Sequence, residues 1–194
     1  MTDRPAAITI LGSRLLLRPL LPPEIDDEWR EMVEADPMSI TVLPSEAAFR
    51  ERLERSGRLE DGWLDLAIDL DGTCIGRIQT FVPPEGLPPG VFEVGIGLRP
   101  HMRGRGHGRE ALALLTDWLF ERADASRVQA PTDPENVAMR TVFDRVGWEL
   151  VETYRDFDRT WVLYAITRER WEARTGGRRP TSRGSGGGPP RRAP

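Results

Sequence analysis

Arg103-Gly104-Arg105-Gly106-His107-Gly108 joins two segments of different periodicity. Residues 92–98 before it alternate like a strand, and residues 110–120 after it repeat apolar side chains at helical spacing. Three glycines at this junction let the backbone approach a ligand closely, and they leave N–H groups unpaired at the positive end of the helix. Such a place binds phosphate. We therefore expect the chain to hold a phosphorylated ligand.

Common phosphate motifs do not account for this stretch. A Walker loop requires a lysine after its last glycine, and the dinucleotide fingerprint requires G-x-G-x-x-G at the first strand–helix turn. Here the spacing is G-x-G-x-G, without lysine and far down the chain. An arginine–glycine tract that binds RNA would not be flanked by strongly periodic segments. The alternative is a glycine-rich loop that only turns the chain.

Length and composition predict one domain. We expect it over residues 8–174 of the 194, with a flexible N-terminus at residues 1–7 and a disordered tail at residues 175–194. The tail contains glycine, proline, serine and arginine, with no apolar side chain large enough to pack. No apolar run approaches the roughly 20 residues that span a bilayer. A single cysteine, Cys74, excludes an intrachain disulfide. The expected location is cytoplasmic, without membrane attachment.

The charge of the chain is unevenly distributed. The net charge of the chain is −4. The expected tail, residues 175–194, contains five arginines and no acidic residue. Residues 1–174 then contain 22 basic and 31 acidic residues, a net charge of −9. A nucleic-acid-binding domain is normally basic, so we expect no nucleic-acid partner. An acidic body favours cationic partners such as amines. A homodimer is compatible with the sequence.

The patterns along the chain predict a mixed α/β fold in the order β-α-α-β-β-β-α-β-α-β-β, with helices on both faces of the sheet. The expected strands are residues 8–20, 64–70 (with one covered face), 73–82, 91–98, 128–130, 148–154 and 160–166. Helices are expected to begin at Pro22, after a Ser45 cap, after the glycine stretch, and at Pro134.

Two segments resemble the GCN5-related N-acetyltransferases, the GNAT family. Residues 98–108 match its acyl-CoA motif, Q/R-x-x-G-x-G/A after an apolar strand end, through Arg103, Gly106 and Gly108. Residues 136–148, from Asn136 to Trp148, resemble the family's later N-x-x-(small)-x-x-x-(Y)-x-(K/R)-x-G-(F) helix. The resemblance covers about residues 8–167 and implies a mostly antiparallel sheet of about seven strands. The L-x-L-R-P-L pattern of residues 15–20 is most similar to the subgroup of ribosomal-protein alanine N-acetyltransferases, whose acceptors vary.

The resemblance implies acetyl-CoA as acyl donor. Its pyrophosphate would be held by the N–H groups of the glycine stretch, namely Arg103, Gly104, Arg105, Gly106, His107 and Gly108. Its pantetheine arm would pair with the backbone of the preceding strand at Ile96, Gly97 and Leu98, where that strand splays from its neighbour and opens a cleft. Gly95 and Gly97 would keep one face clear, the alternative being a bulge or tight packing. Asn136 would bond the arm, or only cap its helix.

Amine transfer needs a free lone pair, and at pH 7 most α-amines and nearly all lysine amines are protonated. The family often places a base glutamate on this strand, acting through a water. Here that residue is Glu93, which shares a strand face with Gly95 and Gly97. The alternative for Glu93 is an ordinary exposed strand acid.

The proton for the departing thiolate has no obvious source. The family's usual tyrosine falls at Phe143 and its small or serine position at Met139. Tyr154 could substitute only by bending back into the cleft. Of the two histidines, His107 is expected to face phosphate or solvent, and His101 has no second ligand nearby. We therefore expect no metal.

The expected function is transfer of an acetyl group from acetyl-CoA to a primary amine, by direct attack in a ternary complex. The acceptor is a protein N-terminus or a small molecule. Two alternatives remain. The departures at Phe143 and Met139 suggest a CoA-binding module that has lost catalysis, and the acidic body suggests an aminoglycoside-type acetyltransferase.

Overall fold

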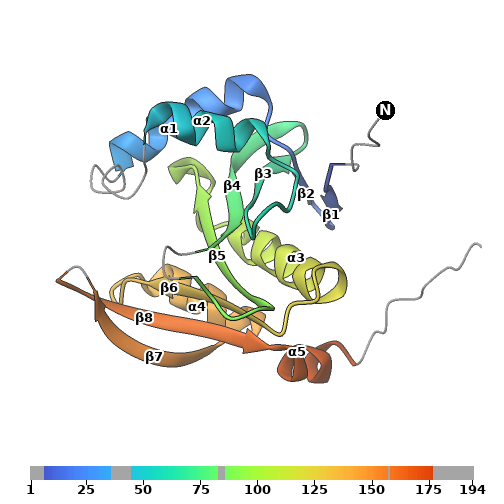
Figure 1. Ribbon diagram of the computed structural model, residues 1–194, viewed down its shortest axis with the longest axis vertical. Coiled ribbons are helices and arrows are strands. Elements are labelled where there is room, and N and C mark those ends of the chain that lie inside the picture. Colours follow the sequence, from blue (N-terminus) through green and yellow to red (C-terminus); the bar gives the residue numbers. More distant parts are fainter. Residues whose placement is uncertain (1–6, 36–44, 83–85, 157, 177–194) are drawn as a thin grey trace, which may run out of the picture.

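The computed structural model describes residues 7–35, 45–82, 86–156 and 158–176, which form one sheet of eight strands with five helices (Figure 1). The strand order is β1-β2-β3-β4-β5-β6-β8-β7, and every neighbouring pair is antiparallel except β5 and β6. The elements are β1 (Ile10–Leu11), β2 (Leu15–Arg18), α1 (Pro22–Ala35), α2 (Glu46–Glu54), β3 (Leu64–Leu70), β4 (Thr73–Phe81), β5 (Val91–Leu98), α3 (His107–Arg122), β6 (Arg127–Thr132), α4 (Val137–Val146), β7 (Glu149–Asp156), β8 (Arg159–Thr167) and α5 (Arg168–Thr175). The mixed, mostly antiparallel sheet is confirmed.

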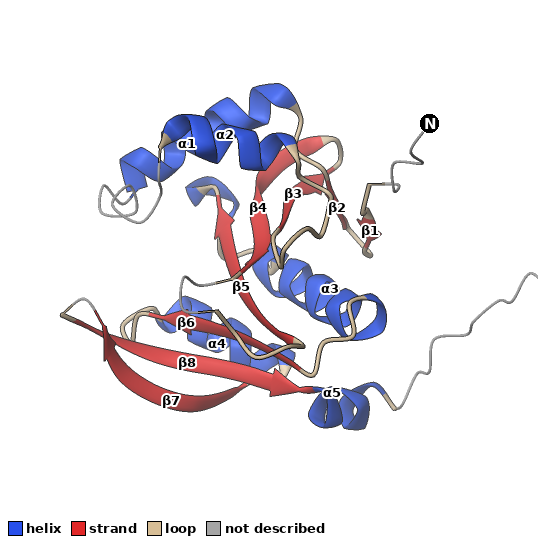
Figure 2. Cartoon of the chain, in the orientation of Figure 1, coloured by secondary structure: helices blue, strands red, loops and turns tan. Residues whose placement is uncertain are grey.

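Different helices cover the two faces of the sheet (Figure 2). On β4, the side chain of Arg77 contacts Glu28 of α1 and the ring of Phe49 of α2. Its neighbour Ile78 belongs to the main core with Leu115 of α3. Since successive strand residues point to opposite faces, α1 and α2 cover one face and α3 covers the other.

The first expected strand, residues 8–20, is instead a hairpin of β1 and β2. The Gly12 N–H donates to the Leu15 carbonyl at 2.8 Å and closes the turn. Glu110 of α3 accepts from the Ser13 hydroxyl at 3.0 Å and from the Arg14 N–H at 2.8 Å. A distant helix therefore stabilises the turn, which the local pattern does not reveal.

Strand β3 is buried on both faces, so the expected single covered face is wrong. Asp65 and Asp69, the polar positions of the alternation, are only 2% and 5% exposed. Arg77 pairs with Asp65 at 2.5 Å, and Arg18 pairs with Asp69 at 2.7 Å. These ion pairs satisfy the carboxylates beneath α1 and α2, which is how charged residues tolerate burial.

The sheet opens between β5 and β6. Their parallel pairing covers only Val91–Glu93 against Arg127–Gln129. Beyond Glu93, β5 pairs with β4 alone, while β6 continues along β8. Figure 1 shows β5 running away from β6 after this point. The expected splay is confirmed, and it exposes one backbone edge of β5 from Val94 onward.

The C-terminal elements differ from expectation in two places. Helix α4 begins at Val137 rather than Pro134, because Asn136 caps it. Helix α5, absent from the sequence reading, follows β8 directly with Thr167 as its N-cap. Thr175 ends this helix and Gly176 caps it with φ 67°, so these two residues do not belong to a tail.

The rest of the expected tail, residues 177–194, lies outside the described residues, as do residues 1–6 of the expected N-terminal segment. Across the described part of the chain, none of the helices combines the length and apolar character required to cross a membrane.

Candidate functional site

The glycine stretch forms a tight connection between β5 and α3. A short 3₁₀ turn at Pro100–Met102 leads into it, and Gly104 and Gly106 adopt left-handed φ angles of 74° and 84°. Such angles favour glycine. Arg103 fixes the connection to the strand, because its Nε donates to the Leu98 carbonyl at 2.8 Å.

Helix α3 begins without a side-chain cap. Gly106 occupies the N-cap position and has no side chain to accept from the first N–H groups. The capping-box position N3 holds Arg109, which cannot accept a hydrogen bond, and the first acid of the helix is Glu110, one residue later. Its carboxylate instead accepts from Ser13, Arg14 and Leu15 of the hairpin. The start of α3 thus presents N–H groups and a positive dipole end to an incoming anion.

A cleft of about 630 Å³ lies between β5, this loop and α4. It brings together eight of the residues predicted to bind the ligand: Ile96, Gly97, Leu98, Arg103, Gly104, Gly106, Gly108 and Asn136. Arg105 lines an adjoining cavity instead. The cleft therefore unites strand, loop and helix residues that lie 40 positions apart in the sequence.

His107 does not face phosphate or solvent, contrary to expectation. Its side chain is only 6% exposed, and it does not line the cleft. Its Nδ1 has no hydrogen-bond partner among the described residues. As the first residue of α3, it can contribute to the cleft through its backbone N–H alone.

The glycines of β5 and β4 have different environments. A Cβ atom added at Gly97 would meet nothing within 4 Å, whereas one at Gly95 would lie 3.2 Å from the Gln79 amide. A Cβ atom at Gly76 of β4 would collide with the Gly97 carbonyl oxygen. Glycine at position 76 therefore allows β4 and β5 to pack closely at this point. Gly97 leaves open space beside the cleft, as expected for a strand that receives a ligand.

Asn136 caps helix α4, which is one of the two roles expected for this residue. Its Oδ1 accepts from the Met139 N–H at 3.1 Å, and its Nδ2 donates to the Thr132 hydroxyl at 3.2 Å. The residue also lines the cleft. Its contact to a bound ligand stays a prediction.

Glu93 is the last residue of β5 that pairs with β6, and the two strands separate after it. It is only 8% exposed, and Gln129 Nε2 donates to its Oε2 at 3.1 Å. It is therefore not an ordinary exposed strand acid. The register places it on the same sheet face as Gly95 and Gly97.

Tyr154 of β7 lies near Glu93. Partial burial raises the pKa of the Tyr154 phenol, and the negative charge of Glu93 raises it further. The charge of Glu93 on β5 therefore acts on Tyr154 of β7, although the two residues lie on opposite sides of the opening between β5 and β6. The raised pKa keeps the phenol protonated at neutral pH.

The absence of a tyrosine at position 143 has a structural reason. Phe143 is 1% exposed and stacks between Trp148 and Tyr164, with ring centroids 5.1 Å and 4.9 Å away. It is a core residue. Met139, at the family's small position, lines the cleft with an apolar side chain.

The acidic residues of α1 are largely neutralised. Five of them form ion pairs with arginines: Glu24 with Arg18, Asp26 with Arg50, Asp27 with Arg30, Glu28 with Arg77, and Glu31 with Arg99. Burial raises the pKa of Glu28 despite the adjacent Arg77. The acidic composition therefore does not by itself create a surface for cationic acceptors on this helix.

Sequence reasoning did not assign to the site six residues that line the cleft, namely Arg109, Val137, Ala138, Thr141, Val142 and Arg145. Arg109 lies three positions after Gly106, so helical spacing at the start of α3 could have indicated it. Arg145 lies nine positions after Asn136, and only the packing of α4 against the loop brings it to the cleft.

Comparisons with known proteins agree with this geometry. Residues 14–149 match the family model described as the acetyltransferase (GNAT) domain. The fold is similar to an acetyltransferase from Agrobacterium tumefaciens, with 25% identity, 86% of this chain and 98% of that chain covered, and a TM-score of 0.64.

Two further solved structures are similar in fold. One is a GNAT-family acetyltransferase from Bacillus anthracis, with 19% identity, coverage of 84% and 99%, and a TM-score of 0.62. The other is an aminoglycoside acetyltransferase in complex with coenzyme A, with 20% identity, coverage of 82% and 98%, and a TM-score of 0.64.

Proposed function

This chain belongs to the GNAT family of acetyltransferases, and from that premise we propose that its cleft transfers an acetyl group from acetyl-CoA to a primary amine on a protein N-terminus or a small molecule. The observation that carries the proposal is the continuity of the cleft. An open backbone edge on β5 leads directly to an uncapped helix start at Gly106.

The residues of the cleft fit the donor. The N–H groups from Gly104 to Gly108 suit a diphosphate, whereas the Arg103 N–H already donates to the Pro100 carbonyl at 3.3 Å. The edge of β5 at Ile96 and Gly97 can pair with the amides of a pantetheine arm as an added strand would. One acceptor is already used, because the Leu98 carbonyl accepts from Arg103. When bound, acetyl-CoA supplies a thioester whose carbonyl carbon accepts an amine lone pair and whose thiolate departs.

Glu93 holds the position of a general base in this proposal. Its carboxylate takes a proton from the acceptor ammonium through a water, which frees the lone pair for attack. The N–C bond forms as the C–S bond breaks, and the second amine proton is released as the amide forms. The Gln129 amide orients the carboxylate by its hydrogen bond.

Tyr154 is the proposed proton donor to the leaving thiolate. Its raised pKa keeps a proton on the phenol, and the buried Phe143 cannot supply one. A thiolate is a fair leaving group, so this contribution is smaller than that of the base.

An α-amine suits this site better than a lysine amine, because its lower pKa leaves about one molecule in ten unprotonated at pH 7. The pattern of residues 15–20 supports a relation to the ribosomal-protein alanine N-acetyltransferases. A cytosolic location belongs to the same proposal, with Cys74 a buried free thiol.

Thiol release from acetyl-CoA tests the proposal with three acceptors: a peptide with a free α-amine, a lysine amine and an aminoglycoside. All 27 lysine-or-arginine positions of the enzyme are arginines, so the enzyme has no lysine of its own to acetylate. Any acetyl-lysine in the reaction therefore comes from the acceptor. Turnover of the α-amine peptide is expected. Tight CoA binding without turnover of any amine would instead indicate a binding module, and turnover of the aminoglycoside alone would indicate a drug-modifying enzyme.

Gly97→Ala tests whether the substrate occupies the space beside β5. The added methyl group meets no protein atom within 4 Å, so the melting temperature should not fall. The methyl group would occupy space beside β5 that the proposal assigns to substrate, so we expect kcat/KM to fall by about tenfold. An unchanged kcat/KM would place the reaction elsewhere.

A further inference from the structure

Gln79 of β4 places a side-chain amide beside Glu93. In the antiparallel register of β4 and β5, Gln79 lies opposite Gly95, and Glu93 is two residues away from Gly95 on the same strand. Since alternate residues of a strand share a face, the side chains of Gln79 and Glu93 lie on one face of the sheet. Such diagonal neighbours are about 7–8 Å apart. A substrate group that contacts Glu93 is therefore within reach of the Gln79 side chain.

The missing side chain of Gly95 gives the Gln79 amide its place. A Cβ atom added at Gly95 would lie 3.2 Å from Gln79 Nε2, 3.5 Å from its Cγ and 3.7 Å from its Cδ. The end of the Gln79 side chain therefore lies across β5, next to the strand that carries the proposed base. Gln79 is only half-buried, so part of its surface stays accessible to a ligand.

Arg77 determines which end of this amide faces a ligand. Its guanidinium donates to Gln79 Oε1, to Asp65 Oδ1 at 2.5 Å and to Glu28 Oε2 at 3.0 Å. A guanidinium has donors only, so the amide must turn its oxygen towards Arg77 and its nitrogen away from it. Within the described part of the chain, Gln79 Nε2 donates no hydrogen bond. The acceptor side of the sheet thus holds a hydrogen-bond donor of fixed orientation.

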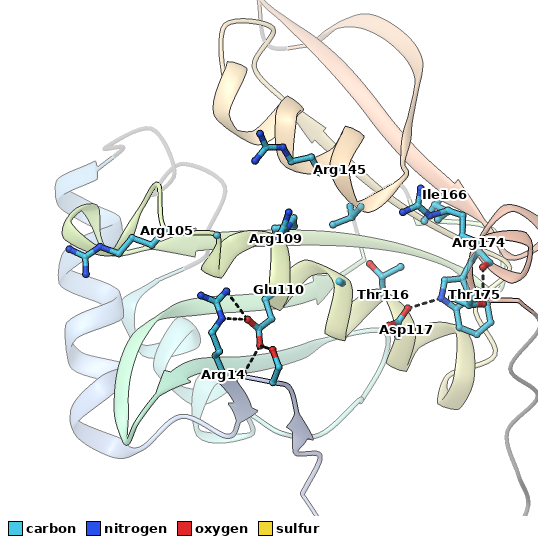
Figure 3. Close-up of a pocket in the computed structure, with 15 residues that line it drawn as sticks. Arg14, Arg105, Arg109, Glu110, Thr116, Asp117, Arg145, Ile166, Arg174 and Thr175 are labelled. Carbon is cyan, nitrogen blue, oxygen red and sulfur yellow. Dashed lines mark hydrogen bonds and ion pairs between the residues drawn. The ribbon is translucent and has the colours of Figure 1, made fainter.

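The positive charge of Arg77 is balanced inside the protein, because Asp65 and Glu28 both pair with it. An environment that suits an anion is different. The cavity of about 690 Å³ beside the glycine loop is lined by five arginines and only two acidic residues (Figure 3). Arg77 therefore orients the Gln79 amide rather than attracting an anionic ligand. Its hydrogen bond to the amide oxygen also polarises the amide and strengthens the N–H groups as donors.

We propose that Gln79 selects the acceptor, because its Nε2 donates to the carbonyl oxygen that follows an α-amine while the amine itself lies at Glu93. The inference rests on the proposed function, since it takes Glu93 as the base and an amine as the acceptor. In a peptide N-terminus, only two carbon atoms separate the amine nitrogen from the carbonyl oxygen, so one residue contacts both side chains. A lysine side-chain amine has no carbonyl group at this place. The site therefore prefers the N-terminus of a peptide.

Acetylation of a peptide with a free α-amine, and of its thioamide analogue, tests the proposal. The analogue replaces only the first carbonyl oxygen by sulfur, a weaker hydrogen-bond acceptor. We expect the wild-type enzyme to prefer the oxygen-containing peptide and Gln79→Met to lose this preference, because methionine has a similar length and no donor. The KM of this variant for the oxygen-containing peptide should rise about tenfold, as expected for one hydrogen bond made alike in the ground and transition states. Its kcat and its pH–rate profile should not change.

Gln79→Glu is a second variant that preserves the ion pairs, because its carboxylate still offers an oxygen to Arg77. It lacks the N–H donor and should also lose the preference for the oxygen-containing peptide. Thr73→Glu is the control, since it adds the same charge at an exposed residue of β4. The control variant should keep the preference of the wild-type enzyme. Melting temperatures establish that each variant is folded.

Three results would overturn the proposal. The first is equal acetylation of the two peptides by the wild-type enzyme, and the second is a preference that persists in both Gln79 variants. The third is a lower kcat with an unchanged KM in Gln79→Met, which would make Gln79 a support for Glu93 rather than a contact to the acceptor. An enzyme that binds acetyl-CoA and acetylates neither peptide would reject the proposed peptide acceptor itself, and this inference with it.

Discussion

Glu93, the proposed base, lies at the point where β5 and β6 part. A carboxylate one residue further along β5 would point to the opposite face, towards the core that α3 covers. The splay therefore selects this residue, and the hydrogen bond from Gln129 fixes its orientation.

Glu93→Gln tests that role. We expect the rate to fall at least tenfold at pH 7, because general bases contribute about 10²–10⁴-fold. The rate should recover partly at high pH, where the acceptor amine loses its proton without help. The measurement is a pH–rate profile beside that of Glu121→Gln, an exposed acid on α3. A profile identical to that of the wild-type enzyme would remove Glu93 from the mechanism.

The first turn of helix α3 contains a residue that lowers helix stability. Its first turn contains Gly108, although alanine is the better helix former. A Cβ atom at Gly108 would lie 3.5 Å from Leu98 Cδ1, an ordinary contact. The fold therefore does not require glycine at this position, and the cleft that Gly108 lines is the remaining reason for it.

Gly108→Ala should separate stability from binding. We expect the free energy of unfolding to rise by about 0.5 kcal/mol, since alanine restricts the unfolded chain. The affinity for CoA should fall in the same variant, because the methyl group projects into the cleft. Thermal melting and calorimetry measure the two quantities. A stabilised protein with undiminished CoA affinity would show that the glycine serves no ligand.

The first turn of α3 also anchors the N-terminal hairpin through Glu110. Hydrogen bonds from Arg14 and Ser13 lower the pKa of this carboxyl below its ordinary value of 4.5, against the opposing effect of burial. A folded-state pKa that is lowered contributes stability above the unfolded pKa, and that contribution is lost as pH falls through the folded value.

Glu110→Gln should therefore destabilise the protein by about 1–2 kcal/mol at pH 7, since hydrogen bonds to a charged acceptor are lost. The difference from the wild-type protein should shrink as the pH falls below about 4.5, where the wild-type carboxyl also becomes neutral. Urea unfolding at a series of pH values measures it. A difference that does not vary with pH would show that the charge of Glu110 is unimportant.

The sheet has two parts, β1 to β5 and β6 to β8, which meet through the short parallel pairing of β5 and β6. Contacts between helices help to hold these two parts in position. Helix α5 follows β8 and packs on α3 through Trp171. Helix α3 also contacts α4, β1, β2 and β5. Trp171 makes this junction through Phe120 and Asp117. The C-terminal helix thus links the part of the sheet that carries Tyr154 to the part that carries Glu93.

Trp171→Ala should cost about 3–5 kcal/mol of folding free energy, as removal of a buried aromatic side chain does. Trp161→Ala on β8 is the control, since that half-buried ring lies over Arg159 and should cost much less. Equal destabilisation by the two substitutions would argue against a special role for α5.

Much of the local structure was predictable because its causes are local. Ser45 caps α2 by accepting from the Ala48 N–H, and Gly147 ends α4 with φ 86°. Asp71 and Gly72 turn the hairpin with positive φ angles. Each of these depends on backbone sterics and on hydrogen bonds within a few residues. The same reasoning located the glycine loop and the helix that follows it.

Features that depend on distant partners were not predictable from residue patterns. Alternation along β3 indicated an exposed face, but α1 and α2 cover it and arginines from three elements neutralise its acids. His107 reads as a loop residue, yet the packing of α3 buries it. Helix α5 is short and polar, and its docking depends on Trp171 finding Phe120.

Residue order alone specified where an anion can approach the backbone, because glycine geometry and an uncapped helix end are properties of consecutive residues. Tertiary packing decided which side chains surround that anion. The charge of Glu93 acts on Tyr154, and Arg174 lines one cavity with Arg145, only after strands separate and helices dock. Burial and long-range charge act through space rather than along the chain, so no periodicity in the sequence encodes these encounters.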